Sequence, residues 1–251
     1  TTLLNNATKG NPVDATAYIT NPGFSRTGNT GYTSGWTNPG DVVSRGGGGR
    51  DDSDGRYVME FYESNVNMSQ TLTGLPAGYY TVSVNGFFRD GSTDNETTKK
   101  RNGQTLKQTA KLIATSNGRQ VETLLPNLTS ELGNFPGLGE TRDGLTGEMP
   151  IECYEAEEYF ATGLYRAETE QILVDNGSLT IGITNTHDGT TGNWVVIDNF
   201  RLTYLYNPQK ELQEAVADNF TGNTTTALHS LQYGQEQCRG RRRQHPRGHG
   251  H

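Results

Sequence analysis

Cysteine is scarce in this sequence. Its 251 residues include only Cys153 and Cys238, which lie far apart, the second in a basic C-terminal segment. A domain held together by disulfides shows a set of several cysteines, and a structural zinc site needs paired Cys or His ligands. Neither pattern is present, so the sequence predicts a fold without a disulfide framework and without a zinc site.

Long apolar runs and common catalytic motifs are also missing. No stretch is long and apolar enough to cross a membrane as a helix. There is no G-x-S-x-G turn and no H-E-x-x-H pair, and Cys153 has no histidine near it in sequence. Acidic residues are plentiful, but none forms a pair in a context distinctive of a glycosidase. We therefore expect a protein that is not an enzyme.

The charge is unevenly distributed along the chain. The net charge is −7, yet five of the 21 Lys and Arg residues fall in residues 239–251, which hold no acid. The remaining 16 basic and 28 acidic residues give the rest of the chain a net charge of −12. An acidic body argues against nucleic acid as a partner. Residues 221–251, rich in Gln, Arg, His and Gly, predict a disordered tail, which we interpret as non-native.

What the sequence does have is a strand pattern interrupted by turns. Apolar residues make up 31% of the chain, and 32 residues are glycine, a composition typical of turn-rich all-β domains. Ser116-Asn117-Gly118 is a strong hairpin signal. The expected strands are residues 17–20, 57–62, 67–72, 79–89, 110–115, 119–125, 165–174, 178–184 and 192–204. This series predicts an all-β fold, a jelly-roll β-sandwich.

Helical signals are few. Residues 151–162 predict one short helix inserted in the sandwich, because Pro150 precedes it and Gly163 follows it. Residues 90–108 are expected to form a polar loop, and residues 126–150 a long irregular stretch of the kind that is usually functional or disordered. The predicted organisation is an N-terminal extension at 1–14, the sandwich at 15–206, a short helix or linker at 207–220, and the tail at 221–251.

One carboxylate stands out in the last expected strand. Because strand side chains alternate between faces, Asp198 should share a face with Trp194, Val196, Phe200, Leu202 and Tyr204. A carboxylate on an apolar face is costly unless something pairs with it. A cation, an arginine and main-chain donors are all possible partners for Asp198.

Three motifs together resemble those of a known family. They are N-P-G-F at 21–24 followed by G-W at 35–36, Q-T-L at 70–72 followed by L-P-A-G-Y-Y-T-V-S at 75–83, and V-I-D-N-F-R-L at 196–202. Their order resembles that of carbohydrate-binding modules with the galactose-binding-like β-sandwich, the group around families 4, 9 and 22. The helix near residue 155 and the long loop before it resemble the variant common in exported proteins of Bacteroidetes. The resemblance covers roughly residues 15–206.

The resemblance implies a structural calcium ion at the edge of the sandwich. In such modules the aspartate of the last strand is a ligand, and Asp198 matches that position. The loop that contains Asp52 and Asp54 falls where the family supplies further oxygens. Where the family usually has an acid directly after the opening Phe, this sequence has Ser25. Oxygen ligands of this kind suit a hard cation.

Two places could hold a sugar, which protein sites bind with an aromatic platform and planar polar side chains. The first is the sheet face with Tyr62, Asn85, Phe87 and Arg89, where Phe87 is the favoured platform because its neighbours on that face are polar. The second is a loop end with Tyr32, His187, Asn193 and Trp194. Phe24 and Trp36 are instead expected in the core.

The sequence thus favours non-catalytic binding of plant cell-wall or other polysaccharide on a calcium-stabilised β-sandwich. The expected location is secreted or at a bacterial cell surface, as one domain of a larger exported protein. A structural or adhesive β-sandwich that binds no glycan is the main alternative. An unrecognised glycan hydrolase or esterase is a further one.

Overall fold

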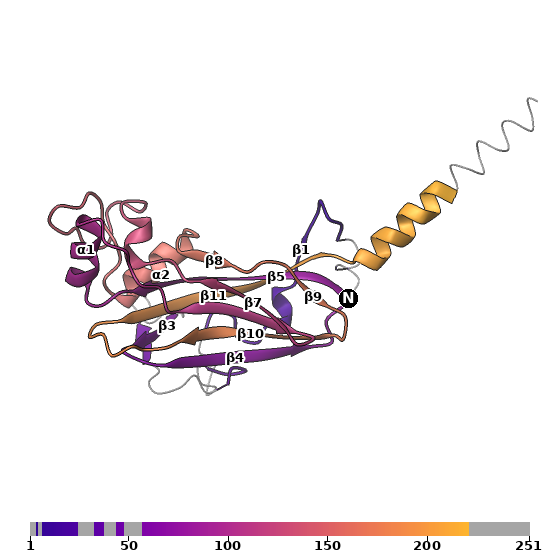
Figure 1. Ribbon diagram of the computed structural model, residues 1–251, viewed down its shortest axis with the longest axis horizontal. Helices are drawn as coiled ribbons and strands as arrows, with labels where there is room; N and C mark the ends of the chain where they lie inside the picture. The colour runs from indigo at the N-terminus through magenta and orange to yellow at the C-terminus, as the bar shows by residue number, and fades with distance from the viewer. Residues whose placement is uncertain (1–3, 5–6, 25–32, 38–43, 48–56, 221–251) are drawn as a thin grey trace, which may run out of the picture. The chain divides into compact units, whose positions relative to one another are not determined.

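The fold is an all-β sandwich, as the sequence predicts. The computed structural model describes residue 4 and residues 7–24, 33–37, 44–47 and 57–220. The chain divides into two units, Thr1–Tyr206 and Asn207–His251. The first unit contains two antiparallel sheets, one of seven strands and one of four, with helices α1 and α2 at the same end (Figure 1).

The larger sheet is built around the longest strand of the structure. Its main path is β2–β3–β11–β5–β8, while β1 pairs with β11 and β9 pairs with β5. The strands are β1 (Val13–Asp14), β2 (Ser44–Gly47), β3 (Tyr57–Tyr62), β5 (Gly78–Arg89), β8 (Arg166–Glu168), β9 (Ile172–Val174) and β11 (Trp194–Tyr206). The single strand expected at 165–174 is therefore two short strands, both paired with β5.

The smaller sheet has the order β4–β10–β6–β7. Its strands are β4 (Val66–Thr73), β6 (Lys111–Ser116), β7 (Arg119–Leu124) and β10 (Ser178–Asn185). Asn117 and Gly118 join β6 to β7 with φ of 52° and 74°, the positive values that a two-residue hairpin turn requires. This confirms the hairpin prediction.

The main hydrophobic core lies between the two sheets. Alternate residues of facing strands fill it, as in Met68 and Leu72 of β4 and Val82 and Val84 of β5. Phe24 and Trp36 are buried in this core, as predicted, and their ring centroids lie 5.5 Å apart. Both rings pack against Phe200. Leu4 and Ala7 are also buried in this core, and β1 pairs with β11, so residues predicted as an N-terminal extension belong to the sandwich.

Two segments differ from the expected secondary structure. Residues predicted as a strand at 17–20 instead form the end of a 3₁₀ turn at Thr16–Tyr18 and the bend after it. The Asp14 carboxylate accepts a hydrogen bond from the Thr16 N–H at the start of this turn. The segment predicted as a polar loop at 90–108 contains the helix α1 (Thr93–Arg101). The side chain of Ser92 caps this helix by accepting from the Asn95 N–H.

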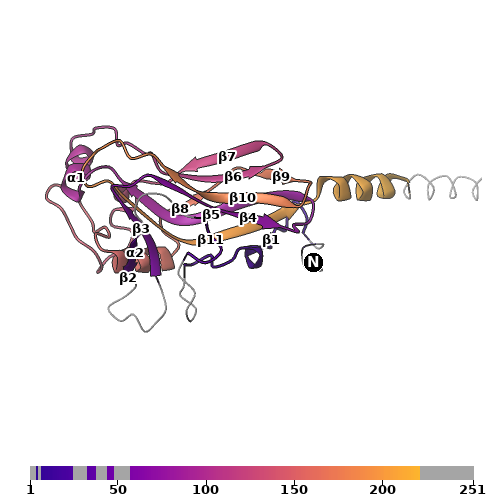
Figure 2. The same cartoon turned by 90° about the horizontal axis from the view of Figure 1, so that it is seen from below.

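A second hydrophobic cluster covers the outer face of the larger sheet. The helix α2 (Cys153–Ala161), predicted at 151–162, lies against β3 and β11 (Figure 2). Ala156, Tyr159 and Phe160 of α2 are buried against Phe87 of β5 and Val196 of β11. The segment before α2 joins this cluster through the 3₁₀ turn Leu128–Glu131. The long irregular stretch thus covers a sheet face.

The strand β11 changes face in its middle. Pairing with β5 is irregular between Asp198 and Arg201, and Asn199 has φ of 55°, in the left-handed region. The bulge inserts a residue and reverses the alternation. Trp194 and Val196 therefore belong to the cluster under α2, whereas Phe200 and Leu202 belong to the main core. The expectation that Asp198 shares a face with Phe200 and Leu202 is wrong for this reason.

The second unit contains a helix at residues 208–220, close to the predicted 209–220. Leu212, Val216 and Phe220 recur every fourth residue on one side of it and are more than half exposed. Within the described ranges, no helix is long and apolar enough to span a membrane.

Candidate functional site

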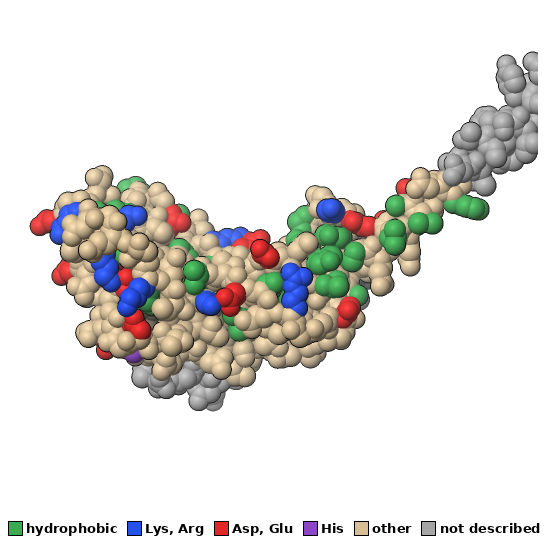
Figure 3. Space-filling model, viewed as in Figure 1, with side chains coloured by type: hydrophobic (Ala, Val, Ile, Leu, Met, Phe, Trp, Pro, Cys, Tyr) green, Lys and Arg blue, Asp and Glu red, His purple; other side chains and the backbone are tan. Residues whose placement is uncertain are grey.

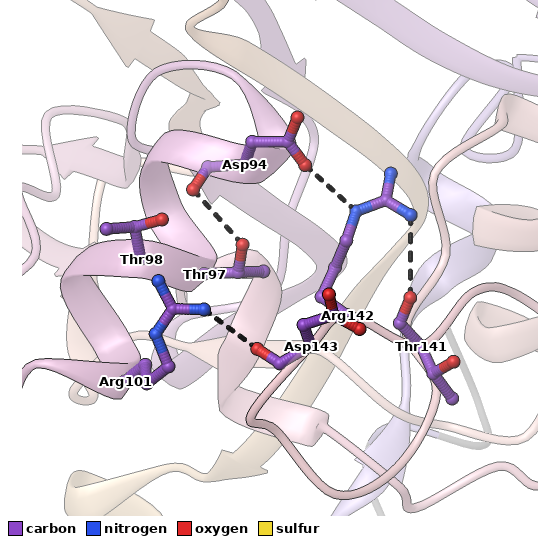
Figure 4. Close-up of a pocket in the computed structure, with 7 residues that line it drawn as sticks. All are labelled: Asp94, Thr97, Thr98, Arg101, Thr141, Arg142 and Asp143. Atoms are coloured by element: carbon purple, nitrogen blue, oxygen red, sulfur yellow. Dashed lines mark hydrogen bonds and ion pairs between the residues drawn. The ribbon is translucent and has the colours of Figure 1, made fainter.

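A polar pocket lies between α1 and the irregular segment before α2. Its volume is about 530 Å³. We call it the α1 pocket. It is lined by Asp94, Thr97, Thr98 and Arg101 of α1 and by Thr141, Arg142 and Asp143 (Figure 4). The four helix residues recur at spacings of three and four residues, which places them on one side of α1.

One wall of the α1 pocket is held by Arg142. Its Nε lies 3.1 Å from Oδ1 of Asp94, and its Nη1 donates to the Glu140 carboxylate. Arg142 thereby ties the irregular segment to the first turn of α1. The arginine carries two acidic neighbours, so its charge is balanced within the protein.

The opposite wall contains Arg101 at the last turn of α1. Its Nη1 donates to the main-chain carbonyl of Asp143 at 2.9 Å. Gly144 makes this position possible, because a Cβ there would lie 2.6 Å from Cδ of Arg101. Gly144 also has φ of 78°, in the region that favours glycine. The side chain of Arg101 therefore occupies space that a Cβ at residue 144 would fill.

A buried carboxylate fixes α1 to the sandwich. Glu96 is fully buried, and its two oxygens accept from the main-chain N–H groups of Asp90 at 2.7 Å and Thr129 at 2.8 Å. Burial raises the pKa of Glu96, while these two hydrogen bonds oppose the rise. Glu96 thus joins the end of β5, the helix and the irregular segment at one point.

A second acid supports the same junction. Asp90 is fully buried, and its Oδ2 lies 2.7 Å from Nζ of Lys99 and accepts from the Lys107 N–H. Lys107 in turn pairs with Asp188 in the loop before β11. These contacts connect both ends of α1 to the strands beneath it.

Removing Glu96 should release α1. We expect Glu96→Ala to lower the free energy of unfolding by about 2–6 kcal/mol, because two buried N–H groups would lose their acceptor at about 1–3 kcal/mol each. Urea denaturation measures the change, with the exposed Glu170→Ala as the control. Glu96→Gln keeps one oxygen acceptor and should cost less than Glu96→Ala. Equal effects of Glu96→Ala and Glu170→Ala would show that these bonds do not hold the helix.

The predicted residues Arg89, Asn193 and Trp194 lie at the start of α1. Arg89 is 8% exposed, donates to the carbonyl of Gly192 and to the hydroxyl of Thr93, and lies 4.8 Å from the Trp194 ring. Burial lowers the pKa of Arg89. Asn193 accepts from the Gly91 N–H. The structure brings these three together, but as buried supports for the start of α1.

The predicted aromatic platform is buried. Phe87 has no exposed surface, and its ring centroid lies 5.1 Å from those of Tyr165 and Trp194. Trp194 is 3% exposed, and its Nε1 donates to Glu60. Asn85 donates to the carbonyl of Leu164 beneath the same cover. The prediction of an open sugar-binding face at Asn85 and Phe87 is wrong because α2 and the segment before it cover that face.

The remaining predicted sugar residues do not gather in one place. Tyr62 is 45% exposed at the end of β3. The His187 N–H donates to Oδ1 of Asn65, and the imidazole Nδ1 has no hydrogen-bond partner within the described ranges. Tyr32 lies outside the described residues.

Only one predicted calcium ligand can be placed. Asp52, Asp54 and Ser25 lie outside the described residues. Asp198 is 6% exposed, and among the described residues its Oδ1 has no hydrogen-bond partner. Burial, with a smaller contribution from Glu157, raises the pKa of Asp198 well above 3.8. In the part of the chain that the structure describes, no three acidic, His or Cys side chains gather as a metal site. Asp198 is therefore the one predicted calcium ligand whose surroundings the structure describes.

The pocket residues were not among those predicted from the sequence. Two features of the sequence could have indicated them. The segment that supplies Thr141, Arg142 and Asp143 is longer than an ordinary loop. The α1 sequence has acids in its first turn and Lys99, Lys100 and Arg101 in its last, the charge asymmetry expected of a helix. Charged side chains of both signs are interspersed over this end of the molecule (Figure 3).

Comparisons with known proteins give structural similarity only. No protein-family model matches the chain, and no curated protein matches its sequence. One similar structure is the enzymatically active domain of bacteriophage CBA120 tailspike protein 4, with 12% identity and a TM-score of 0.37 over 74% of this chain. The chain spans 21% of that tailspike structure.

Two carbohydrate-binding modules are also similar. The module from Cellvibrio mixtus lichenase 5A, solved with cellotriose, has 9% identity and a TM-score of 0.33, over 69% of this chain and 95% of the module. A family 35 module from Clostridium thermocellum has 14% identity and a TM-score of 0.28, over 67% of this chain and 92% of the module. Scores this low do not carry a functional assignment.

Proposed function

We propose that this chain binds carbohydrate without catalysis and that the sugar binds in the α1 pocket. The observation that carries the proposal is the chemistry of the lining. Hydroxyl, guanidinium and carboxylate groups face one another across a space of about 530 Å³. That volume is within the usual range for small-molecule sites, roughly 300–1,000 Å³.

Sugar hydroxyls both donate and accept hydrogen bonds, so a site for them needs partners of both kinds. Arg101 and Arg142 donate only, whereas the carboxylates of Asp94 and Asp143 accept only. Thr98 and Thr141 can do either. The pocket thus offers every partner that a ring of hydroxyl groups requires.

The proposal is for binding because the charged groups of the pocket are engaged in holding its walls. Asp94 pairs with Arg142, and Arg101 donates to the carbonyl of Asp143. Such internal contacts fix the positions of donors and acceptors before a ligand arrives, which lowers the cost of binding. Polysaccharides outside the cell are the natural ligands of such a site, so we infer a secreted or surface location within a larger exported protein.

Calcium belongs to the proposal as a structural ion. Asp198 offers a buried carboxylate oxygen, Oδ1, that no donor in the described part of the chain satisfies, and such an oxygen suits a hard cation. Asp198 would be one ligand, and calcium would stabilise the sandwich without taking part in sugar binding.

A polysaccharide binding screen tests the function. Retarded migration in native gels that contain xylan, glucan, galactan or pectin is the expected result. Thr98→Trp should abolish it, because the indole would fill the α1 pocket. Lys100→Trp is the matched control, since residue 100 is exposed but does not line the pocket. Circular dichroism should show that both variants stay folded.

The outcomes separate the hypotheses. Retardation that Thr98→Trp leaves intact would place the sugar elsewhere on the chain. A negative result on all four polymers and on a broad glycan array would reject carbohydrate binding. It would favour a structural or adhesive role.

A further inference from the structure

We propose that the α1 pocket prefers a sugar that carries a carboxylate, a uronic acid, and that Arg101 is the residue that binds this group. This inference rests on the proposed function, because it specifies the ligand class of the same pocket. It follows from the difference between the two arginines of the site.

The charge of Arg142 is already satisfied by the protein. Asp94 lies 3.1 Å from its Nε, and Glu140 accepts from its Nη1. A ligand carboxylate near Arg142 would meet two negative groups. Arg142 therefore shapes the pocket and is unsuited to binding an anion.

The charge of Arg101 is not satisfied in this way. Its one hydrogen bond goes to a neutral acceptor, the main-chain carbonyl of Asp143. Across the described part of the chain, no carboxylate lies within ion-pair distance of its guanidinium. Its Nε and Nη2 keep their hydrogens for a ligand. The Arg101 guanidinium is therefore a positioned cation without a counter-ion among the described residues. A neutral sugar would not pair with this charge.

The position of Arg101 is set by the main chain. The carbonyl of Asp143 holds one nitrogen, and the absence of a side chain at Gly144 makes room for the aliphatic part of Arg101. Side chains of arginine normally lose much rotamer freedom on binding. In the folded protein the Arg101 side chain has already lost part of its rotamer freedom before a ligand binds. A bidentate contact with a ligand therefore costs less conformational entropy.

A carboxylate matches what this arrangement presents. The planar guanidinium fork pairs with two carboxylate oxygens at once. Thr98 lies one turn before Arg101 on the same side of α1, so its hydroxyl can donate a further hydrogen bond. The carboxylate of Asp143 is exposed at the rim, where it can accept from a sugar hydroxyl and water screens its repulsion.

The lining of the pocket is also unsuited to neutral polysaccharides, which proteins recognise by stacking aromatic side chains on the sugar rings. Among the described residues that line the pocket, none is aromatic. Neutral glucans and xylans present apolar ring faces, which aromatic side chains recognise. A charged substituent recognised by arginine does not need such a platform.

The decisive experiment compares two forms of one ligand. Oligogalacturonate and its fully methyl-esterified form have the same sugar chain, but only the first carries carboxylates. Isothermal titration calorimetry on the full chain should show at least about tenfold tighter binding of the acid form, as expected for one charge-assisted contact. Oligoglucuronate is the second acid ligand, because it shares the carboxylate but differs in a hydroxyl configuration.

Three variants assign the effect to Arg101. Arg101→Gln should remove the preference for the acid form, and Arg101→Lys should restore it only in part, because an ammonium cannot pair bidentately. Arg119→Gln is the charge-matched control, since Arg119 is exposed at the start of β7 and does not line the pocket. It should leave the preference intact. The control also accounts for any adsorption of a polyanion to the basic C-terminal segment, which all variants retain.

The outcomes distinguish this inference from the proposed function. Equal binding of both forms, lost in Thr98→Trp, would overturn the uronate preference and leave sugar binding in the pocket. Preference for the acid form that survives Arg101→Gln would overturn the role of Arg101. Failure of the chain to bind any glycan, neutral or acidic, would overturn the proposed function and this inference with it.

Discussion

Replacing Phe87 by alanine is expected to lower the free energy of unfolding by about 3–5 kcal/mol, the usual cost of such a change in a core. The side chain is fully buried under α2 and contacts Phe160, Tyr165 and Trp194. Alanine would leave a cavity that these rings can fill only in part. Urea denaturation curves, fitted for both midpoint and slope, measure the loss.

Tyr62→Ala provides the contrast for Phe87→Ala. Tyr62 is 45% exposed on β3 of the same sheet, so its loss should change stability by no more than about 0.5 kcal/mol. Phe87→Leu, which keeps most of the volume, should fall between the two. A Phe87→Ala protein with unchanged stability and lost glycan binding would contradict the buried position. It would restore the sequence-based interpretation of Phe87 as a platform.

Asp198→Asn should have opposite effects with and without calcium. With a chelator at neutral pH, the variant is expected to melt at a higher temperature than the unaltered protein, by about 2–4 °C for each kcal/mol gained. The reason is that asparagine removes the cost of a buried negative charge whose Oδ1 has no donor among the described residues. Calcium should raise the melting temperature of the unaltered protein and leave that of Asp198→Asn unchanged.

The pH dependence of stability has a definite sign. Burial raises the pKa of Asp198 above its unfolded value of 3.8, so the folded state binds the proton more tightly than the unfolded state. Its contribution to stability is fully present below pH 3.8 and is lost as pH rises through the folded pKa. Asp198→Asn should abolish this part of the profile in chelator. Calcium competes with the proton, so its stabilising effect should grow with pH.

Differential scanning calorimetry at several pH values measures both effects. The exposed Glu170→Gln is the control for removing one carboxylate. A calcium response that survives in Asp198→Asn would place the ion at other residues. A lower melting temperature of Asp198→Asn in chelator would show that main-chain donors already stabilise the ionised carboxylate.

Local sequence patterns were sufficient to predict most strands. The strand expected at 57–62 coincides with β3, and the expected 79–89 and 178–184 agree with β5 and β10 to within a residue. Alternation and turn chemistry act over a few residues, so a single sequence contains them. Helix α2 was predicted for the same reason, because Pro150 and Gly163 mark its ends.

The layer over the larger sheet could not be predicted in this way. Asn85 and Arg89 are polar, so the face that they share with Phe87 looked solvent-exposed. Tertiary contacts decide otherwise, since Asn85 reaches the carbonyl of Leu164 and Arg89 reaches that of Gly192. A polar side chain with a main-chain partner can be buried as readily as an apolar one, and the sequence does not show the partner.

The candidate site itself was not predicted from the sequence. The sequence placed Arg89 on a sheet face and Asn193 and Trp194 at a separate loop end, whereas the structure brings these three together at the start of α1. The pocket itself joins Arg101 to Asp143 across 42 positions of the chain. Its position depends on the buried Glu96, whose two acceptor contacts appear only in the folded chain.

The change of face in β11 has a consequence for how the sandwich unfolds. Before Asn199 the strand supplies Trp194 and Val196 to the cluster under α2, and after it Phe200 and Leu202 to the main core. Because β11 supplies residues to both clusters, loss of packing in one cluster should displace the β11 backbone and disturb the other cluster. The two layers are therefore mechanically coupled. The sandwich, with its helical cover, should open as a single cooperative unit.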